Sequence, residues 1–323
     1  MTDLILHHYP HSPFSEKVRL ILGHKQLRWK SVLISSIMPK PDVVALSGGY
    51  RRTPLLQIGA DIYCDTALIC DVLEHLQPTP TLYPEPEKGL SRILAQWADS
   101  TLFWAAMAYN LQPKGAAEMF AKAPPEAAKA FGEDRGKMTA SGMLRLRPGD
   151  ATAAYKSYLR RLSDVLDDRP FLLGEAPCIS DFAAYHPLWY TRRIDAIKDI
   201  LDLTPAVGDW MNRVAAIGHG AMEKFSSAEA IALAKASTPE VIAAQAGGAP
   251  SLLPDNVFQN EHGIALGSRV SVRAESFGPE ETEGDLMAAT RMHYTLRRTD
   301  ERAGTVHVHF PRIGYVLKAV TPA

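Results

Sequence analysis

A short apolar run followed by a Ser-Pro pair constrains the fold of this chain more than any other feature. The run Leu4–Leu6 predicts a strand, and the apolar residues Val18 and Leu20–Leu22 predict a helix after it. Ser12 and Pro13 lie where that helix begins. Serine is a favoured N-cap, and proline fits the first helical position because its missing N–H would be unpaired there. The sequence therefore predicts a strand, a loop and a helix whose N-terminus favours an anion.

The first 78 residues continue as a mixed α/β unit. Trp29–Ile34 predicts a second strand, and Thr53–Ile58 with Asp61–Cys64 predicts a hairpin. Asp65-Thr66 supplies a cap for a further helix that continues to Leu76. The predicted order is β-α-β followed by β-β-α.

Two changes of pattern divide the rest of the chain. The proline-rich residues 78–86 mark a boundary, and residues 87–236 predict an all-α domain. Residues 238–254, rich in Ala, Gly and Pro, predict a linker before a β-rich extension at 255–323. We expect a small sheet or half-barrel there, packed on the helical domain. Its predicted strands are residues 270–273, 286–297, 306–310 and 315–320.

Composition excludes several classes of protein. Lys and Arg number 35 against 36 Asp and Glu, so no overall charge favours nucleic acid or an anionic membrane. Three cysteines are too few for a disulfide framework, which favours a reducing compartment. The sequence contains neither a signal-peptide pattern nor an apolar run long enough to span a membrane. We therefore expect a cytoplasmic protein.

Three motifs together resemble the cytosolic glutathione S-transferases. Ser12-Pro13-Phe14-Ser15 is similar to the serine motif of the plant-type enzymes and to the Cys-Pro-Phe-Cys of glutaredoxins. Thr53-Pro54 precedes a strand where the thioredoxin-like fold has its cis-proline, and Asp65-Thr66 stands where the family usually has Glu-Ser. The resemblance implies a thioredoxin-like domain at 1–80 and a transferase helical domain at 87–236. It says nothing about residues 238–323.

The resemblance also implies a site and a reaction. Glutathione would be the co-substrate, its thiolate would attack a small electrophile, and the protein would form a homodimer. The Ser12 hydroxyl would stabilise the thiolate, and Asp65 and Thr66 would bind the γ-glutamyl end. The resemblance implies the following site residues: Ser12 as the catalytic residue, with Arg52, Thr53, Pro54, Asp65 and Thr66 as glutathione-binding residues.

Each assignment has an alternative. Ser12 and Asp65 are also ordinary helix caps, and Ser15 or Tyr9 are further candidates for thiol activation. The fold alone also allows a non-catalytic protein that binds glutathione or a partner. A thiol-disulfide oxidoreductase is disfavoured, because both cysteine positions of the redox motif hold serine.

Two further groups of residues are considered as sites. Trp104, Met107 and Tyr109 are candidates for the electrophile pocket of the helical domain, although residues of these types more often form a core. His307 and His309 alternate on one predicted strand, with His293 on a neighbouring one. We interpret this pattern as histidines on an exposed strand face and assign no metal.

Overall fold

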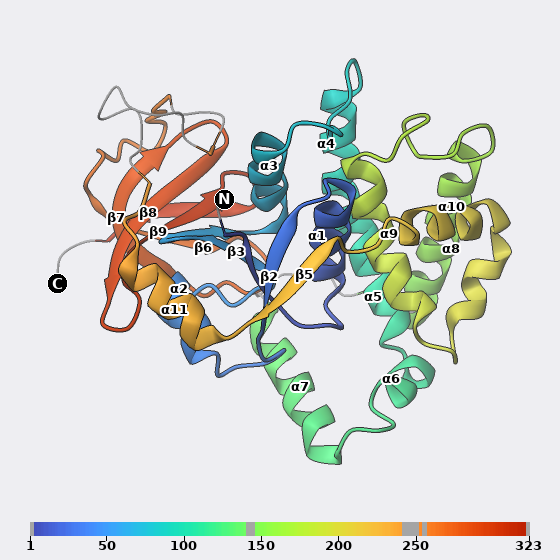
Figure 1. Ribbon diagram of the computed structural model, residues 1–323. Coiled ribbons are helices and arrows are strands. Elements are labelled where there is room, and N and C mark those ends of the chain that lie inside the picture. The colour runs from blue at the N-terminus through green and yellow to red at the C-terminus, as the bar shows by residue number, and fades with distance from the viewer. Residues whose placement is uncertain (1–2, 140–145, 241–251, 254–256, 321–323) are drawn as a thin grey trace.

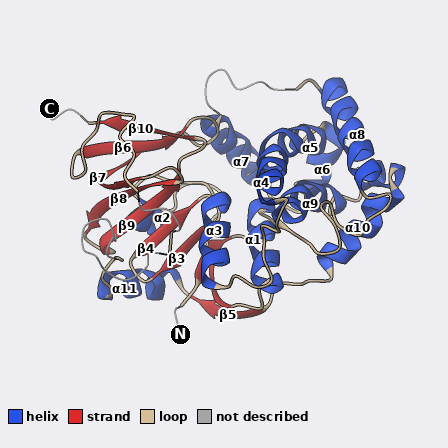
Figure 2. Ribbon diagram, turned by 90° about the horizontal axis from the view of Figure 1, so that it is seen from above, coloured by secondary structure: helices blue, strands red, loops and turns tan. Residues whose placement is uncertain are grey.

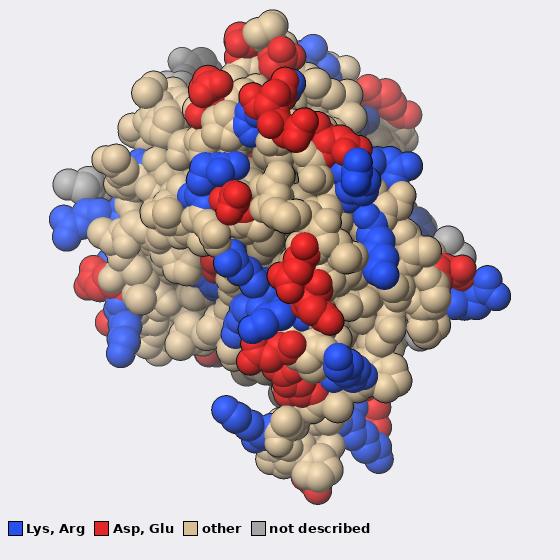
Figure 3. Space-filling model, turned by 90° about the vertical axis from the view of Figure 1, so that its right-hand side faces the viewer, with Lys and Arg blue, Asp and Glu red and all other residues tan. Residues whose placement is uncertain are grey.

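One ten-stranded sheet and one helical bundle make up the molecule (Figures 1 and 2). The computed structural model describes residues 3–139, 146–240, 252–253 and 257–320. Acidic and basic side chains are interspersed over the face shown in Figure 3. Within these ranges, no helix is both long enough and apolar enough to cross a membrane.

The N-terminal unit has the predicted β-α-β and β-β-α order. Strand β1 (Ile5–His8) pairs in parallel with β2 (Arg28–Leu33) and antiparallel with β3 (Leu55–Ile58), which pairs antiparallel with β4 (Asp61–Cys64). The helices are α1 (Pro13–His24), α2 (Pro41–Ser47) and α3 (Thr66–Leu76). The sequence analysis did not predict α2, which begins at Pro41, a residue that fits the first position of a helix.

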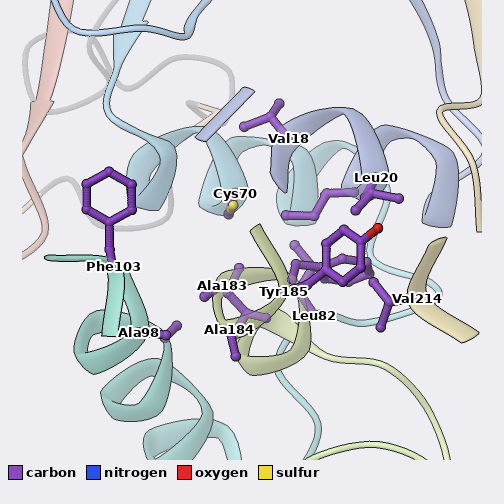
Figure 4. Packing of buried hydrophobic residues seen from close by; sticks show 14 of the residues in the cluster. Val18, Leu20, Cys70, Leu82, Ala98, Phe103, Ala183, Ala184, Tyr185 and Val214 are labelled. Carbon is purple, nitrogen blue, oxygen red and sulfur yellow. The ribbon is translucent and has the colours of Figure 1, made fainter. Parts of the chain in front are cut away.

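The helical region packs on α1 and α3. Helices α4 (Lys88–Trp97) and α5 (Phe103–Asn110) are joined by a π-helical turn, η1 (Ala98–Leu102). The remaining helices are α6 (Pro113–Met119), α7 (Pro125–Met138), α8 (Pro148–Val165), α9 (Ile179–Arg192), the 3-10 helix η2 (Lys198–Leu203) and α10 (Pro205–Ala215). Buried side chains of α1, α3, α5 and α9 form one continuous core, part of which is shown in Figure 4.

Residues 221–225, predicted as part of the all-helical domain, instead return to the sheet. They form β5 (Ala221–Phe225), which pairs in parallel with β2. Helix α11 (Ser227–Ala236) follows, with a capping box made by Ser226 and Glu229. The side chains of β5 are mostly exposed and show no alternation of burial, so hydrophobic periodicity does not identify this strand.

The C-terminal strands continue the N-terminal sheet, whereas the sequence analysis placed them on the helical domain. They are β6 (Arg269–Ala274), β7 (Thr282–Ala289), β8 (His293–Asp300), β9 (Gly304–Pro311) and β10 (Tyr315–Ala319). Strand β9 pairs in parallel with β4, with Asp61 opposite His307 and Tyr63 opposite His309. Strand β4 would otherwise be an edge with unpaired backbone groups. Pairing also buries Val308 in a core shared with Ile62.

The single predicted strand at 286–297 is a hairpin, β7–β8. No glycine or proline marks its turn. The Thr290 hydroxyl oxygen instead accepts hydrogen bonds from the backbone N–H groups of Met292 and His293, each at 3.1 Å. A threonine side chain that organises a turn gives a weaker sequence signal than Gly or Pro.

Candidate active site

The three loops that carry the predicted site residues lie at one end of the sheet. His7 in β1 pairs with Leu55 in β3, and Leu55 pairs with Cys64 in β4. The carboxyl end of β1, the amino end of β3 and the carboxyl end of β4 are therefore adjacent. Ser12, Thr53 and Asp65 follow or precede those strand ends, so strand order alone brings them together.

Ser12 is the N-cap of α1. Its backbone is extended, with φ −75° and ψ 120°, and its side-chain oxygen accepts a hydrogen bond of 3.1 Å from the Ser15 N–H. The Ser12 hydroxyl donates to no acceptor among the residues that the structure describes. Capping uses a lone pair of the oxygen and leaves the O–H available, so one hydroxyl can both cap the helix and donate to a bound anion.

The two alternative activating residues have different surroundings. The Ser15 hydroxyl is fully buried and has no hydrogen-bond partner in the described part of the chain. The Tyr9 hydroxyl accepts a bond of 3.4 Å from Arg135 of α7. Ser12 is therefore the candidate at the start of α1 whose oxygen caps the helix and whose O–H remains available to donate a hydrogen bond.

Thr53 presents an unpaired piece of backbone beside β3. The Thr53–Pro54 peptide bond is cis. Neither the N–H nor the C=O of Thr53 pairs with another group in the described ranges, and the residue is half-buried. Backbone groups left unpaired beside a strand can accept an extended peptide as an added strand.

Lys40 is a site residue that the sequence analysis missed. Its Nζ donates to the Thr53 hydroxyl and to the Arg51 carbonyl, both at 3.1 Å. Burial, together with the charges of Arg135 and Arg51, lowers the pKa of Lys40 to about 8. Lys40 lies between two prolines, and nothing in this local pattern indicates a contact with Thr53.

Asp65 is held in an unusual conformation at the start of α3. Its φ is +74°, which non-glycine residues rarely adopt, and its Oδ1 accepts a bond of 3.0 Å from the Ala67 N–H. Such outliers often occur at functional positions. The Thr66 hydroxyl beside it accepts a bond of 3.3 Å from Lys17. The N-terminal end of α3 thus offers the Asp65 carboxylate, the Thr66 hydroxyl and the partial positive charge of the helix dipole.

A buried charge network behind Thr66 was also missed. Lys17 of α1, with a side chain only 1% exposed, lies 2.6 Å from Asp99 in η1, whose other oxygen is 2.9 Å from His186 Nε2 in α9. Burial would raise the pKa of Asp99, but the Lys17 charge and the His186 hydrogen bond outweigh it and hold that pKa below its usual value. The network links α1, the helical bundle and Thr66, and no local pattern in the sequence reveals it.

Arg52, expected to pair with a glutathione carboxylate, is in contact with the C-terminal extension. Its Nε donates to the Phe277 carbonyl at 2.5 Å, and its Nη1 lies 3.5 Å from Asp65 Oδ2. The Tyr315 hydroxyl donates to the same Asp65 oxygen at 3.0 Å. The extension therefore reaches the candidate site, which the sequence analysis did not anticipate.

The three candidates for the electrophile pocket lie in different environments. Trp104 is half-buried and contacts the ring of Phe277, with centroids 5.1 Å apart. Met107 is buried in the core, and the Tyr109 hydroxyl donates to the Ile197 carbonyl at 3.2 Å. Trp104 is therefore the one of the three in contact with a group beside the site.

The strand histidines are buried, contrary to the interpretation of an exposed face. His309 Nε2 is 2.9 Å from Asp61 Oδ1, and the His309 ring stacks on Tyr63 with centroids 4.5 Å apart. His307 Nδ1 lies 3.7 Å from the same oxygen. The seam between β4 and β9 buries this face. In the described residues, no group of three or more His, Cys, Asp and Glu side chains is arranged to hold a metal ion.

The sequence and the fold resemble known proteins. Residues 6–81 match the family "Glutathione S-transferase, N-terminal domain" and residues 96–213 match "Glutathione S-transferase, C-terminal domain". A GST-like protein from Pseudomonas syringae is 40% identical, with a TM-score of 0.77, and the match covers 99% of this chain and 100% of that chain. The match to this protein therefore includes the C-terminal extension.

Two more distant proteins match about two thirds of the chain or less. FtsZ-localized protein A from Caulobacter vibrioides is 26% identical over 187 residues, which are 55% of this chain and 73% of that protein. A glutathione S-transferase from Rhodospirillum rubrum shares the fold, with a TM-score of 0.52 and 20% identity over 66% of this chain and 88% of that chain.

Proposed function

The chain belongs to the glutathione S-transferase family, and we propose that it binds glutathione at this end of the sheet and activates its thiol with Ser12. The thiolate would then attack a small electrophile. The thiol proton leaves to solvent, the sulfur forms a bond to the electrophilic carbon, and the leaving group departs with its electron pair.

The unpaired backbone of Thr53 carries this proposal. Glutathione is a tripeptide, and its cysteinyl residue has one N–H and one C=O that match the groups Thr53 offers. An added strand at this position would place the cysteinyl side chain at the end of the sheet where α1 begins. Thus the same contact that binds the backbone directs the sulfur toward Ser12.

Groups on either side of Thr53 suit the two ends of the tripeptide. The γ-glutamyl ammonium would bind the Asp65 carboxylate, and its carboxylate would bind Thr66 at the N-terminus of α3. Lys40 donates to the Thr53 hydroxyl and Arg52 immediately precedes Thr53 in the chain, and either cation suits the glycyl carboxylate. Asp is one methylene shorter than the usual Glu, so the ammonium would have to approach α3 more closely.

Ser12 and its helix supply enough energy to ionise the thiol. A free thiol has a pKa of about 8.5, so ionisation near neutral pH needs a shift of roughly two units, or about 2.7 kcal/mol. A hydrogen bond to a charged sulfur contributes about 1.5–3 kcal/mol. The N-terminus of α1 adds about 0.3–1 kcal/mol. Together they contribute about 1.8–4 kcal/mol, a range that contains the required value without a general base.

Calorimetric titration with reduced glutathione tests the binding step. We expect saturable heat with the unmodified protein and clearly weaker binding with Asp65→Ala, because that substitution removes the carboxylate for the γ-glutamyl ammonium. Glu283→Gln, on the outer part of the sheet, is a matched control that removes a carboxylate whose partner among the described residues is Arg269. Absence of binding by the unmodified protein would refute the proposal.

A non-catalytic, partner-binding role is the second candidate. The similarity to FtsZ-localized protein A favours it, and so do the extension groups that already contact Arg52 and Asp65. The two candidates differ in one measurable property. A transferase ionises bound glutathione near neutral pH, whereas a pure binding protein has no need to shift the thiol pKa.

The remaining parts of the proposal concern the setting of the reaction. We propose a two-fold homodimer and a reducing, cytoplasmic environment, in which the three buried free cysteines, Cys64, Cys70 and Cys178, stay reduced. Of Trp104, Met107 and Tyr109, we propose that Trp104 contacts the electrophile, because it lies beside the segment that touches Arg52.

A further inference from the structure

A short segment of the C-terminal extension lies directly on the candidate glutathione site. Residues 275–281 connect β6 to β7, and we name this segment the strap. Since β6 ends and β7 begins near the start of β10, the strap and Tyr315 lie at the same end of the sheet. Figure 2 shows α7 between this end of the extension and the rest of the helical bundle.

The strap is anchored to the N-terminal unit by two arginines. The Phe277 carbonyl accepts from Arg52, and the Glu280 carboxylate accepts from Arg51 Nη1 at 2.6 Å. The chain passes so close to α2 that a Cβ on Gly49 would lie 2.1 Å from the Glu281 carbonyl oxygen. These contacts place the strap against the loop that immediately precedes Thr53.

The strap is also anchored to the helical bundle. The Gly278 N–H donates to the Met138 carbonyl at 2.6 Å, and the Phe277 ring contacts Trp104. Arg51 pairs with Asp134 of α7 as well as with Glu280, so one buried guanidinium joins the strap to α7. The strap therefore bridges the two parts of the molecule between which glutathione would bind.

The groups that the strap and Tyr315 engage are those that the tripeptide needs. Arg52 is bonded to Phe277, and one oxygen of Asp65 is bonded to Tyr315. A carboxylate that approaches the Nε of Arg52 meets the Phe277 carbonyl, and an ammonium that approaches the Oδ2 of Asp65 shares that oxygen with the Tyr315 hydroxyl. Glutathione and the extension thus compete for the same donors and acceptors.

One unsatisfied polar atom in the closed strap favours its release when glutathione binds. The Glu280 Oε2 atom is buried and has no hydrogen-bond partner among the described residues. A buried carboxylate oxygen without a partner lowers the stability of the arrangement that contains it. Opening of the strap exposes this oxygen to water, so part of the energy lost with the Arg51 contact is recovered.

We propose that the strap is a lid built into the extension, which closes the glutathione site and is displaced from Arg52 when the tripeptide binds. This inference rests on the proposed function and adds a regulatory role for residues 275–281. The apparent dissociation constant then equals the intrinsic value divided by the fraction of molecules with an open strap. Weakening the strap raises that fraction and tightens the binding of glutathione.

Two variants weaken the strap without touching a proposed glutathione contact. Glu280→Gln removes the charge that pairs with Arg51, and Phe277→Ala removes the ring that packs on Trp104. We expect each to bind reduced glutathione up to about tenfold more tightly in calorimetry, the change that 1.4 kcal/mol produces. Thermal denaturation of each variant establishes that it is folded. Glu283→Gln is the matched control and should bind as the unmodified protein does.

Trp104 gives a second and independent readout. Displacement of Phe277 changes the surroundings of the Trp104 indole, so glutathione should alter the tryptophan fluorescence of the unmodified protein. The change should disappear in Trp104→Phe, which leaves four other tryptophans as an internal reference, since the chain has five.

The outcomes separate the two proposals. Tighter binding by Glu280→Gln and Phe277→Ala, with an unchanged control, supports the lid. Binding equal to that of the unmodified protein refutes it, and weaker binding refutes it too, because the strap would then complete the site. If the unmodified protein does not bind glutathione, the proposed function itself is refuted and the lid with it.

Discussion

The Lys17–Asp99–His186 network gives the sharpest prediction about stability. Lys17 has a side chain 1% exposed and Asp99 one that is 20% exposed, with 2.6 Å between Nζ and Oδ2. Removing one member of a buried ion pair costs about 3–5 kcal/mol, because the other charge remains buried without compensation. We expect Asp99→Asn to cost about 3 kcal/mol, at the low end of this range, because the amide oxygen still accepts a hydrogen bond from Lys17.

Substitution of the other member of the pair, Lys17, should cost less stability than Asp99→Asn. In Lys17→Met, the remaining Asp99 carboxylate keeps its hydrogen bond from His186 and is partly in contact with solvent. The double variant Lys17→Met/Asp99→Asn has no buried charge at this position. We therefore expect it to be more stable than Asp99→Asn alone, which two independent substitutions could not produce.

Urea unfolding at neutral pH measures these differences, with tryptophan fluorescence as the signal. A coupling free energy near zero, with the two single costs adding in the double variant, would show that the pair does not stabilise the fold. Arg160→Met and Asp164→Asn form a matched cycle at an exposed i,i+4 pair, 78% and 61% exposed. The coupling free energy in that cycle should be about 0.5 kcal/mol or less.

Three further predictions concern pH, the sheet and assembly. Burial lowers the pKa of His7 from 6.5 to about 4, so between these pH values the unfolded state binds a proton there and the folded state does not. His7 should therefore contribute a loss of up to roughly 3 kcal/mol of stability as pH drops from 6.5 toward 4, and His7→Gln should reduce the slope in urea titrations by that share, while His24 and His307, whose pKa values are also lowered to about 4, keep theirs. Phe310→Ala should cost about 3–5 kcal/mol of stability, because β9 shares a core with β4, and should lower the midpoint of unfolding seen by tryptophan fluorescence even though every tryptophan lies before residue 211. An unchanged midpoint would mean that the extension folds independently. Light scattering should give about twice the 35.4 kDa of one chain, and a mass of one chain would contradict the homodimer.

Local sequence patterns predicted every element of the N-terminal unit except α2, because each of the others carries its own signal. Ser12-Pro13 marks a helix start, and alternation around residues 53–64 marks a hairpin. Strand order then brings Ser12, Thr53 and Asp65 to one end of the sheet. The family resemblance supplied the roles of these residues, which remain proposals.

The features that were missed depend on contacts between residues far apart in the chain. Lys17 meets Asp99 across 82 residues, and Tyr315 meets Asp65 across 250. Such pairs leave no periodicity in either segment. The pairing of β9 with β4 was unpredictable for the same reason, since an alternating apolar strand fits any open sheet edge equally well. The extension was therefore predicted as strands, but not as part of the N-terminal sheet or of the site.

The thiol pKa of bound glutathione tests the central claim most directly. Ultraviolet absorbance of the thiolate, titrated against pH in the complex, should show ionisation about two units below the value of 8.5 for a free thiol. Ser12→Ala should move that midpoint up by one to two units, or roughly 1.4–2.7 kcal/mol, and should cost about 1 kcal/mol of stability through the lost cap. Ser15→Ala, which removes the unpartnered hydroxyl, should leave the midpoint in place. An unchanged titration in Ser12→Ala would contradict the assignment of Ser12 as the group that activates the thiol.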